Sequence, residues 1–181
     1  MPNEHDKLNR CFIPLSPRTT NRKYKVIACH DMAGGYNDDR FIQGSQNTNT
    51  YRFQYWSLID YFIYFSHSRL TIPPVNWTIA AHRNGVKVLG TFIAEGEDGS
   101  LDSVKLIYGP NSEKKDAFST FYADMLIEMA EFYGFDGWFF NFEAAIDACH
   151  IPHLIQFLDY FTRRLHSKIP GSISLWYQLA L

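Results

Sequence analysis

The chain has 181 residues, of which 46% are hydrophobic and 20% charged, so it has enough apolar material for one folded domain and too little charge for a disordered chain. A formal net charge of −2 argues against a nucleic-acid partner. The three cysteines (Cys11, Cys29 and Cys149) form neither a metal-binding spacing nor an even disulfide set, the N-terminus lacks the apolar core of a secretory signal, and no apolar run could span a bilayer. We therefore expect a cytosolic monomer that needs no metal or cofactor and does not bind membranes.

Residues 1–23 contain two prolines and a basic pair, and predict an irregular N-terminal arm before a domain at 24–181. Strand patterns then alternate with helical ones, starting with a strand at 25–29, a polar loop at 31–50 and a short helical piece at 56–60. Pro73 opens a helix that runs through Asn84, where Gly85 stops it. A second helix has Asn111 or Ser112 as its cap, apolar positions from 118 to 132 and Gly134 as its end. Four further strands are predicted at 61–66, 86–93, 135–143 and 172–177, and a third helix at 151–167.

Repeated strand-then-helix units predict a parallel α/β sheet, because parallel neighbours need a crossover connection. A Rossmann sheet is disfavoured since no GxGxxG motif follows the first strand. A (β/α)8 TIM barrel is the better fit, although such barrels usually need about 250 residues and the five strands here do not close one. The sequence thus predicts an incomplete barrel of about five βα units.

The stretch Phe135–Glu143 carries the strongest chemical signal. Side chains two apart in a strand share a face, so Asn141 and Glu143 point the same way. They stand at the carboxyl end of the strand, where α/β barrels keep their catalytic residues. A strand-end pair that only hydrogen-bonds a neighbouring loop would show the same spacing, so the spacing alone leaves both interpretations open.

A single carboxylate beside an amide suits one kind of glycoside cleavage. Glycosidases normally use two carboxylates. If the sugar carries a 2-acetamido group, however, its own carbonyl oxygen can attack the anomeric carbon. The protein then needs one acid/base, the role of Glu143, and one partner for the acetamide N–H, the role of Asn141.

Five separated segments resemble glycoside hydrolase family 85, the family of cytosolic endo-β-N-acetylglucosaminidases. They are His30–Tyr36, Asp39–Ser45, Thr71–Val75, Gly90–Ile93 and Phe135–Trp138. The resemblance implies a (β/α)8 barrel that hydrolyses the GlcNAc-β-1,4-GlcNAc bond of N-glycans, glycopeptides or free oligosaccharides with retention, an enzyme of the mannosyl-glycoprotein type. The family's Asn-x-Glu pair matches Asn141 and Glu143, and its assisting tyrosine matches Tyr177.

Three further residues are candidates for substrate contact. His30 and Asp31, at the end of the first strand, are expected to line the sugar cleft, with loop anchoring as the alternative. Glu95, at the end of the third strand, is a weaker candidate, because it stands among the charges of a solvated loop.

The sequence departs from the family pattern at Gly96, where a tryptophan is expected, at Ala144, where an asparagine is expected, and after Tyr177. The last departure predicts a truncated barrel whose stability and activity are reduced. The leading hypothesis is therefore a glycan hydrolase, and the main alternative is an inactive fragment that binds glycan or a partner. A chitinase-like enzyme is a third hypothesis, disfavoured by Asn141 in place of an acid.

Overall fold

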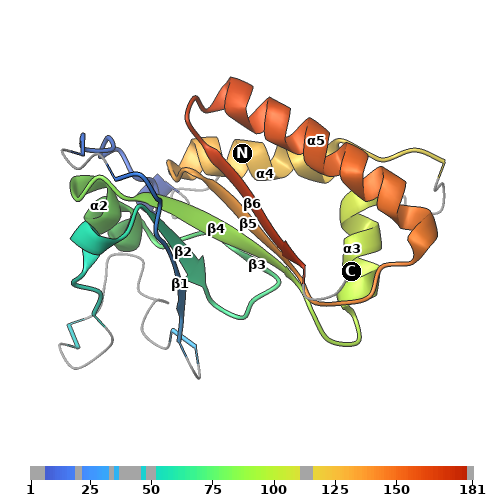
Figure 1. Cartoon of the computed structure of the whole chain (residues 1–181), viewed down its shortest axis with the longest axis horizontal. Coiled ribbons are helices and arrows are strands. Elements are labelled where there is room, and N and C mark those ends of the chain that lie inside the picture. The colour runs from blue at the N-terminus through green and yellow to red at the C-terminus, as the bar shows by residue number, and fades with distance from the viewer. Residues whose placement is uncertain are drawn as a thin grey trace.

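A computed structural model of the chain describes residues 7–18, 22–32, 35–36, 46–47, 52–110 and 116–178. One curved sheet forms its centre, with strand order β1-β2-β4-β5-β6 and every neighbouring pair in this order parallel. Helices pack along its outer side (Figure 1). The strands are β1 (Ile27–Asp31), β2 (Tyr61–Phe65), β3 (Leu70–Thr71), β4 (Lys87–Ala94), β5 (Gly137–Phe142) and β6 (Ile173–Gln178). The helices are α2 (Val75–Arg83), α3 (Gly99–Tyr108), α4 (Phe121–Tyr133) and α5 (Ile151–Lys168), with 3-10 turns η1 (Trp56–Leu58) and η2 (Ala148–His150).

The two faces of the sheet carry different side chains, as the period of two requires. On β5, Trp138, Phe140 and Phe142 face the helices and are almost completely buried. Phe157 and Phe161 of α5 pack against this face, and each fully buried ring stabilises the fold by about 2–3 kcal/mol. The opposite, concave face holds a smaller apolar cluster of Ile63, Phe65, Leu89, Ile93 and Phe139. Burial of the aromatic side chains against the helices therefore fixes which side chains point to the concave face of the sheet.

Local sequence signals define the ends of two helices. Pro74 precedes the first turn of α2, and Gly85 follows the helix with φ of 69°. Gly134 ends α4 in the left-handed conformation with φ of 75°. A side chain at Gly134 would also collide with the arm, since a Cβ there would lie 2.3 Å from the carbonyl oxygen of Cys11. Both helix ends therefore follow the predicted glycine signals.

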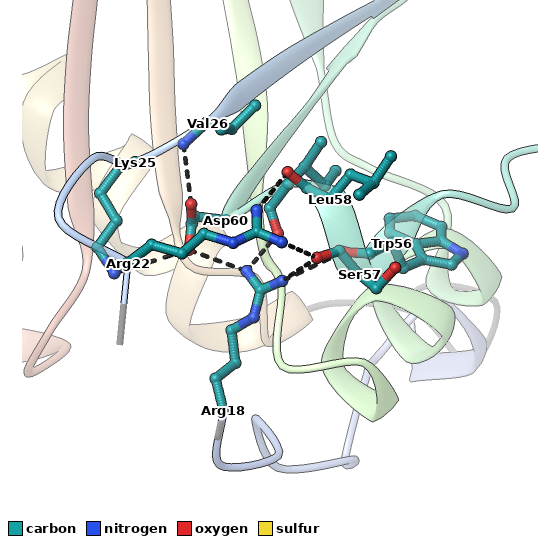
Figure 2. A network of polar contacts seen from close by, with 9 residues as sticks. Arg18, Arg22, Lys25, Val26, Trp56, Ser57, Leu58 and Asp60 are labelled. Atoms are coloured by element: carbon teal, nitrogen blue, oxygen red, sulfur yellow. Dashed lines mark hydrogen bonds and ion pairs between the residues drawn. The ribbon is translucent and has the colours of Figure 1, made fainter. Parts of the chain in front are cut away.

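The part of the N-terminal arm that the structure describes is bound to the end of the sheet where the strands begin. Ser16 N donates to His82 O of α2 and Cys11 N donates to Tyr133 O of α4, each at 2.9 Å. Arg18 contacts the buried carboxylate of Asp60 at 2.9 Å (Figure 2). Arg22 in turn donates to the carbonyl oxygen of Leu58 at 2.7 Å. Burial opposes ionisation of Asp60, but the Val26 N–H, Lys25, Arg18 and Arg22 together hold its pKa below the usual value.

The α/β prediction and its five parallel strands are confirmed, and the (β/α)8 barrel stays a prediction. Helix α3, strand β3 and the 3-10 turn η2 were not predicted. Helix α3 is encoded by a segment rich in Gly, Ser, Asp and Lys, which hides its period. Strand β3 is only two residues long and pairs antiparallel with β4. The expected cap at Asn111 or Ser112 and the family segment at 39–45 lie outside the described residues. Residues 116–120 are not helical, so α4 begins later than predicted, at Phe121. Within the described part of the chain, no helix is long and apolar enough to cross a membrane.

Candidate functional site

A pocket of about 430 Å³ opens at the carboxyl ends of the parallel strands. These ends meet at one edge of a parallel sheet, so residues far apart in sequence gather there. Every parallel strand contributes at least one residue or is followed by one. The lining residues are Cys29, Asp31, Phe65, His67, Glu95, Phe139, Asn141, Glu143 and Tyr177. A larger hollow of about 670 Å³ lies on the outside of α4, but its lining comes mostly from that one helix.

Asn141 and Glu143 both line this pocket. Asn141 is the second-last residue of β5, and Glu143 follows directly after the strand. The side chain of Asn141 is buried, at 3% exposure, and its Nδ2 has no hydrogen-bond partner among the described residues. An unpaired buried amide is costly, and here it faces a pocket in which a ligand would satisfy it. Glu143 is exposed at the same opening. Its backbone N–H donates to Ala94 O at 2.8 Å, which ties it to the end of β4.

Tyr177 stands directly opposite Asn141 in the ladder between β5 and β6. Its side chain is 42% exposed and lines the pocket together with Asn141 and Glu143. The structure thus brings together the three residues that the sequence singled out for catalysis.

Asp31 and His67 line the part of the pocket formed by β1 and β2. Their side chains meet at 2.6 Å between Oδ1 and Nε2, and both are about half exposed. The ring of Phe65 packs edge-on against His67, with 5.0 Å between centroids. A hydrogen-bonded carboxyl group and an aromatic ring therefore support the imidazole from two sides.

Glu95 also lines the pocket and is exposed. His30 is not among the lining residues, because successive side chains of β1 alternate between the two faces. Its Nδ1 lies 2.7 Å from Tyr36 Oη, and its ring packs against Phe62 and Trp77 on the helix side of the sheet. The structure thus brings five of the six predicted site residues together and places His30 elsewhere.

Four lining residues were not named from the sequence: Cys29, Phe65, His67 and Phe139. The period of two contains the signal for two of them, since Cys29 precedes Asp31 by two and Phe139 precedes Asn141 by two. Burial raises the pKa of the Cys29 thiol to about 11, with the charge of Asp31 as a second cause. Cys29 is thus a neutral thiol at physiological pH. No group of three potential metal ligands occurs within the described ranges.

Comparison with known proteins places these residues in a family context. A model of glycosyl hydrolase family 85 matches residues 36–180. The cytosolic endo-beta-N-acetylglucosaminidase of Gallus gallus is 44% identical over 99% of this chain, and cytosolic endo-beta-N-acetylglucosaminidase 1 of Arabidopsis thaliana is 42% identical over 96% of it. The matched parts are 24% and 25% of those relatives, so the chain spans about a quarter of their length.

Among solved structures, a chitinase from Bacteroides thetaiotaomicron superposes with a TM-score of 0.48 and 16% identity. The superposition covers 85% of this chain and 46% of that one, a similarity too low to assign a fold.

Proposed function

Because the chain belongs to glycosyl hydrolase family 85, we propose that it supplies the catalytic residues of an endo-β-N-acetylglucosaminidase acting on the GlcNAc-β-1,4-GlcNAc bond of N-glycans. One observation carries the proposal. Asn141 and Glu143 open into the same pocket, and the buried amide of Asn141 has an unpaired Nδ2 there. The relatives from Gallus gallus and Arabidopsis thaliana are named endo-beta-N-acetylglucosaminidases, which agrees with this chemistry.

In the first step, the acetamide oxygen of the substrate sugar bonds to its own anomeric carbon. The glycosidic C–O bond breaks, and Glu143 gives its proton to the leaving oxygen. In the second step, Glu143 takes a proton from water as that water attacks the anomeric carbon and opens the oxazolinium ring, whose nitrogen has kept its proton. Two inversions at one carbon give net retention. Glu143 ends protonated, ready for the next cycle.

Asn141 and Tyr177 act on the acetamide group in this scheme. The amide of Asn141 has both an acceptor and a donor, and rotation of its side chain presents either one to the substrate. Its oxygen would accept from the acetamide N–H and orient the carbonyl oxygen for attack. Tyr177, opposite Asn141 in the ladder, would hydrogen-bond the same group as the ring closes. Fixing this geometry beforehand lowers the barrier of an intramolecular reaction.

The substrates would be N-glycans, glycopeptides or free oligosaccharides. Their hydroxyl-rich surfaces suit a pocket that combines polar side chains with Phe65 and Phe139. We place the reaction in the cytosol, since both of these relatives are named as cytosolic enzymes.

Release of a fluorescently labelled high-mannose N-glycan tests the proposal. Glu143→Gln keeps the size of the side chain but removes the acid, and we expect at least a hundredfold loss of turnover. Asn141→Ala and Tyr177→Phe should lower turnover with a smaller effect on binding. Glu97→Gln is the matched control, because Glu97 is an exposed carboxylate in the loop between β4 and α3 and does not line the pocket.

A second candidate is glycan binding without turnover. It is favoured by the exposure of the strands at both sheet edges, where Ile27 of β1 is 44% exposed and Tyr177 of β6 is 42% exposed. Titration of the same glycan separates the two. Binding by both the wild-type chain and Glu143→Gln, with no product from either, would support this candidate and refute hydrolysis.

A further inference from the structure

His67 has an unusual backbone conformation at the mouth of the pocket. Among the described residues it is the one non-glycine with a positive φ, at 57°. This left-handed conformation costs an L-residue about 1 kcal/mol or more, and glycine or asparagine adopts it more easily. The turn that links β2 to β3 explains the conformation. It does not explain why the position carries an imidazole.

The turn itself is held by other residues. Ser66 Oγ hydrogen-bonds Thr71 Oγ1, and Ser68 N donates to Ser66 Oγ at 3.3 Å. The side chain of His67 takes no part in these bonds and extends into the pocket. The turn therefore directs this side chain into the pocket.

Asp31 fixes which nitrogen of the imidazole remains free for a ligand. An ionised carboxylate only accepts hydrogen bonds, so His67 Nε2 donates its proton to Asp31 Oδ1 at 2.6 Å. In the neutral ring, Nδ1 is then the acceptor, and among the described residues it has no hydrogen-bond partner. Phe65 restrains the plane of the ring at the same time. A rigid acceptor of this kind suits a hydroxyl group that donates.

We propose that His67, oriented by Asp31, binds a hydroxyl of a neutral sugar of the glycan through Nδ1 and is a substrate-binding residue of the pocket. The inference rests on the proposed function. The strand order separates His67 from the proposed catalytic residues. Strands β1 and β2 lie on one side of β4, and β5, with Asn141 and Glu143 at its end, lies on the other. His67 therefore holds the sugar chain from the wall that does not carry the reacting groups.

Substitution by glycine is the sharpest test. His67→Gly deletes the side chain, and glycine readily adopts the left-handed backbone conformation of the turn. We expect KM for the labelled N-glycan to rise about tenfold, the effect of one lost hydrogen bond, while kcat changes less than threefold. Asp31→Asn should give part of this effect, because the ring loses its orientation but keeps Nδ1. His166→Gln, in the last turn of α5 and exposed, is the control.

Binding is measured separately by titrating the unlabelled N-glycan into Glu143→Gln and into the Glu143→Gln, His67→Gly double variant. A tenfold weaker Kd in the double variant supports the role of His67 whether or not the wild-type chain hydrolyses glycan. Unchanged KM and Kd would overturn this inference and leave the proposed function standing. Should His67→Gly fail to fold, His67→Asn, which also tolerates the turn, is read in the same way. Absence of both binding and turnover in the wild-type chain would refute both proposals.

Discussion

Gly99 lies against Ala144 so closely that a Cβ on Gly99 would stand 2.6 Å from the Cβ of Ala144. The same atom would be 2.8 Å from the carbonyl carbon of Ala94. Ala144 follows Glu143, and Ala94 O accepts the Glu143 N–H. The start of α3 is thus packed directly against the backbone that carries the proposed acid/base.

Gly99→Ala should therefore displace the segment around Glu143. We expect a stability loss of about 1–3 kcal/mol, typical of overpacking, and a fall in kcat larger than the rise in KM. Thermal melting and glycan release measure the two effects. The double variant Gly99→Ala, Ala144→Gly removes the closest clash and should recover part of both. If neither stability nor kcat recovers, the steric clash that matters is with another residue, for example with the backbone of Ala94.

His82 and Asp136 form a buried ion pair at the opposite end of the sheet, with 2.8 Å between Nε2 and Oδ2. His82 Nδ1 donates to Ile13 O at 2.7 Å, and Val88 N donates to Asp136 Oδ2 at 2.8 Å. Burial disfavours the charged imidazole, but the bonds to Asp136, Cys11 and Ile13 and the charge of Asp136 outweigh it. Together they raise the pKa of His82 to about 10.

The raised pKa predicts a loss of stability at alkaline pH. The folded state holds the proton more tightly than the unfolded chain, so the contribution is complete below pH 6.5, declines above it and is gone above about pH 10. The total is on the order of 5 kcal/mol. Urea unfolding at pH 6, 8 and 9.5 should show this slope in the wild type. Asp136→Asn keeps an acceptor for Val88 N but should flatten the slope, and an equal slope in both proteins would contradict the assignment.

The sequence was informative wherever a short-range period decides the geometry. Asn141 and Glu143 share a face because a strand repeats every two residues, and the parallel sheet brings Tyr177 beside them. Long-range packing was not readable in this way. His82 and Asp136 pair although they are 54 residues apart in the sequence. The proposed role of His67 depends on a left-handed turn, and the sequence has no glycine or asparagine at that position to indicate one. Helix α3 was missed because its buried positions include Gly99, Asp102 and Ser103.

Asp60 connects the N-terminal arm to the sheet, since Arg18 and the backbone of Val26 both reach its carboxylate (Figure 2). Asp60→Asn should leave the guanidinium of Arg18 without its charge partner, at a cost of about 3 kcal/mol. The arm should then detach more often, so trypsin should cleave after Arg18 or Arg22 about a hundredfold faster. Mass spectrometry of timed digests measures this rate.

Asp159→Asn is the control for Asp60→Asn, because Asp159 pairs with Arg163 on the exposed surface of α5. Such surface pairs contribute less than about 1 kcal/mol. The pKa of Asp60 is held below its ordinary value of 3.8. Its stabilising charge is therefore present above that pH and lost as the pH falls below it, a loss that Asp60→Asn should abolish. Equal rates of trypsin cleavage in Asp60→Asn and in Asp159→Asn would refute the role of Asp60 in holding the arm.

Cys29 offers a probe of pocket occupancy that needs no enzymatic turnover. Its pKa of about 11 makes its thiolate fraction at pH 8 about 100-fold lower than that of a thiol at the ordinary value of 9.0, so iodoacetamide should label it slowly. Asp31→Asn removes the second cause of the shift and should speed the labelling several-fold. Saturating N-glycan should slow the labelling of Cys29 and leave that of Cys149 unchanged, because both cysteines are exposed but only Cys29 lines the pocket. Equal protection of both cysteines, or of neither, would mean that the glycan does not occupy the pocket beside Asp31.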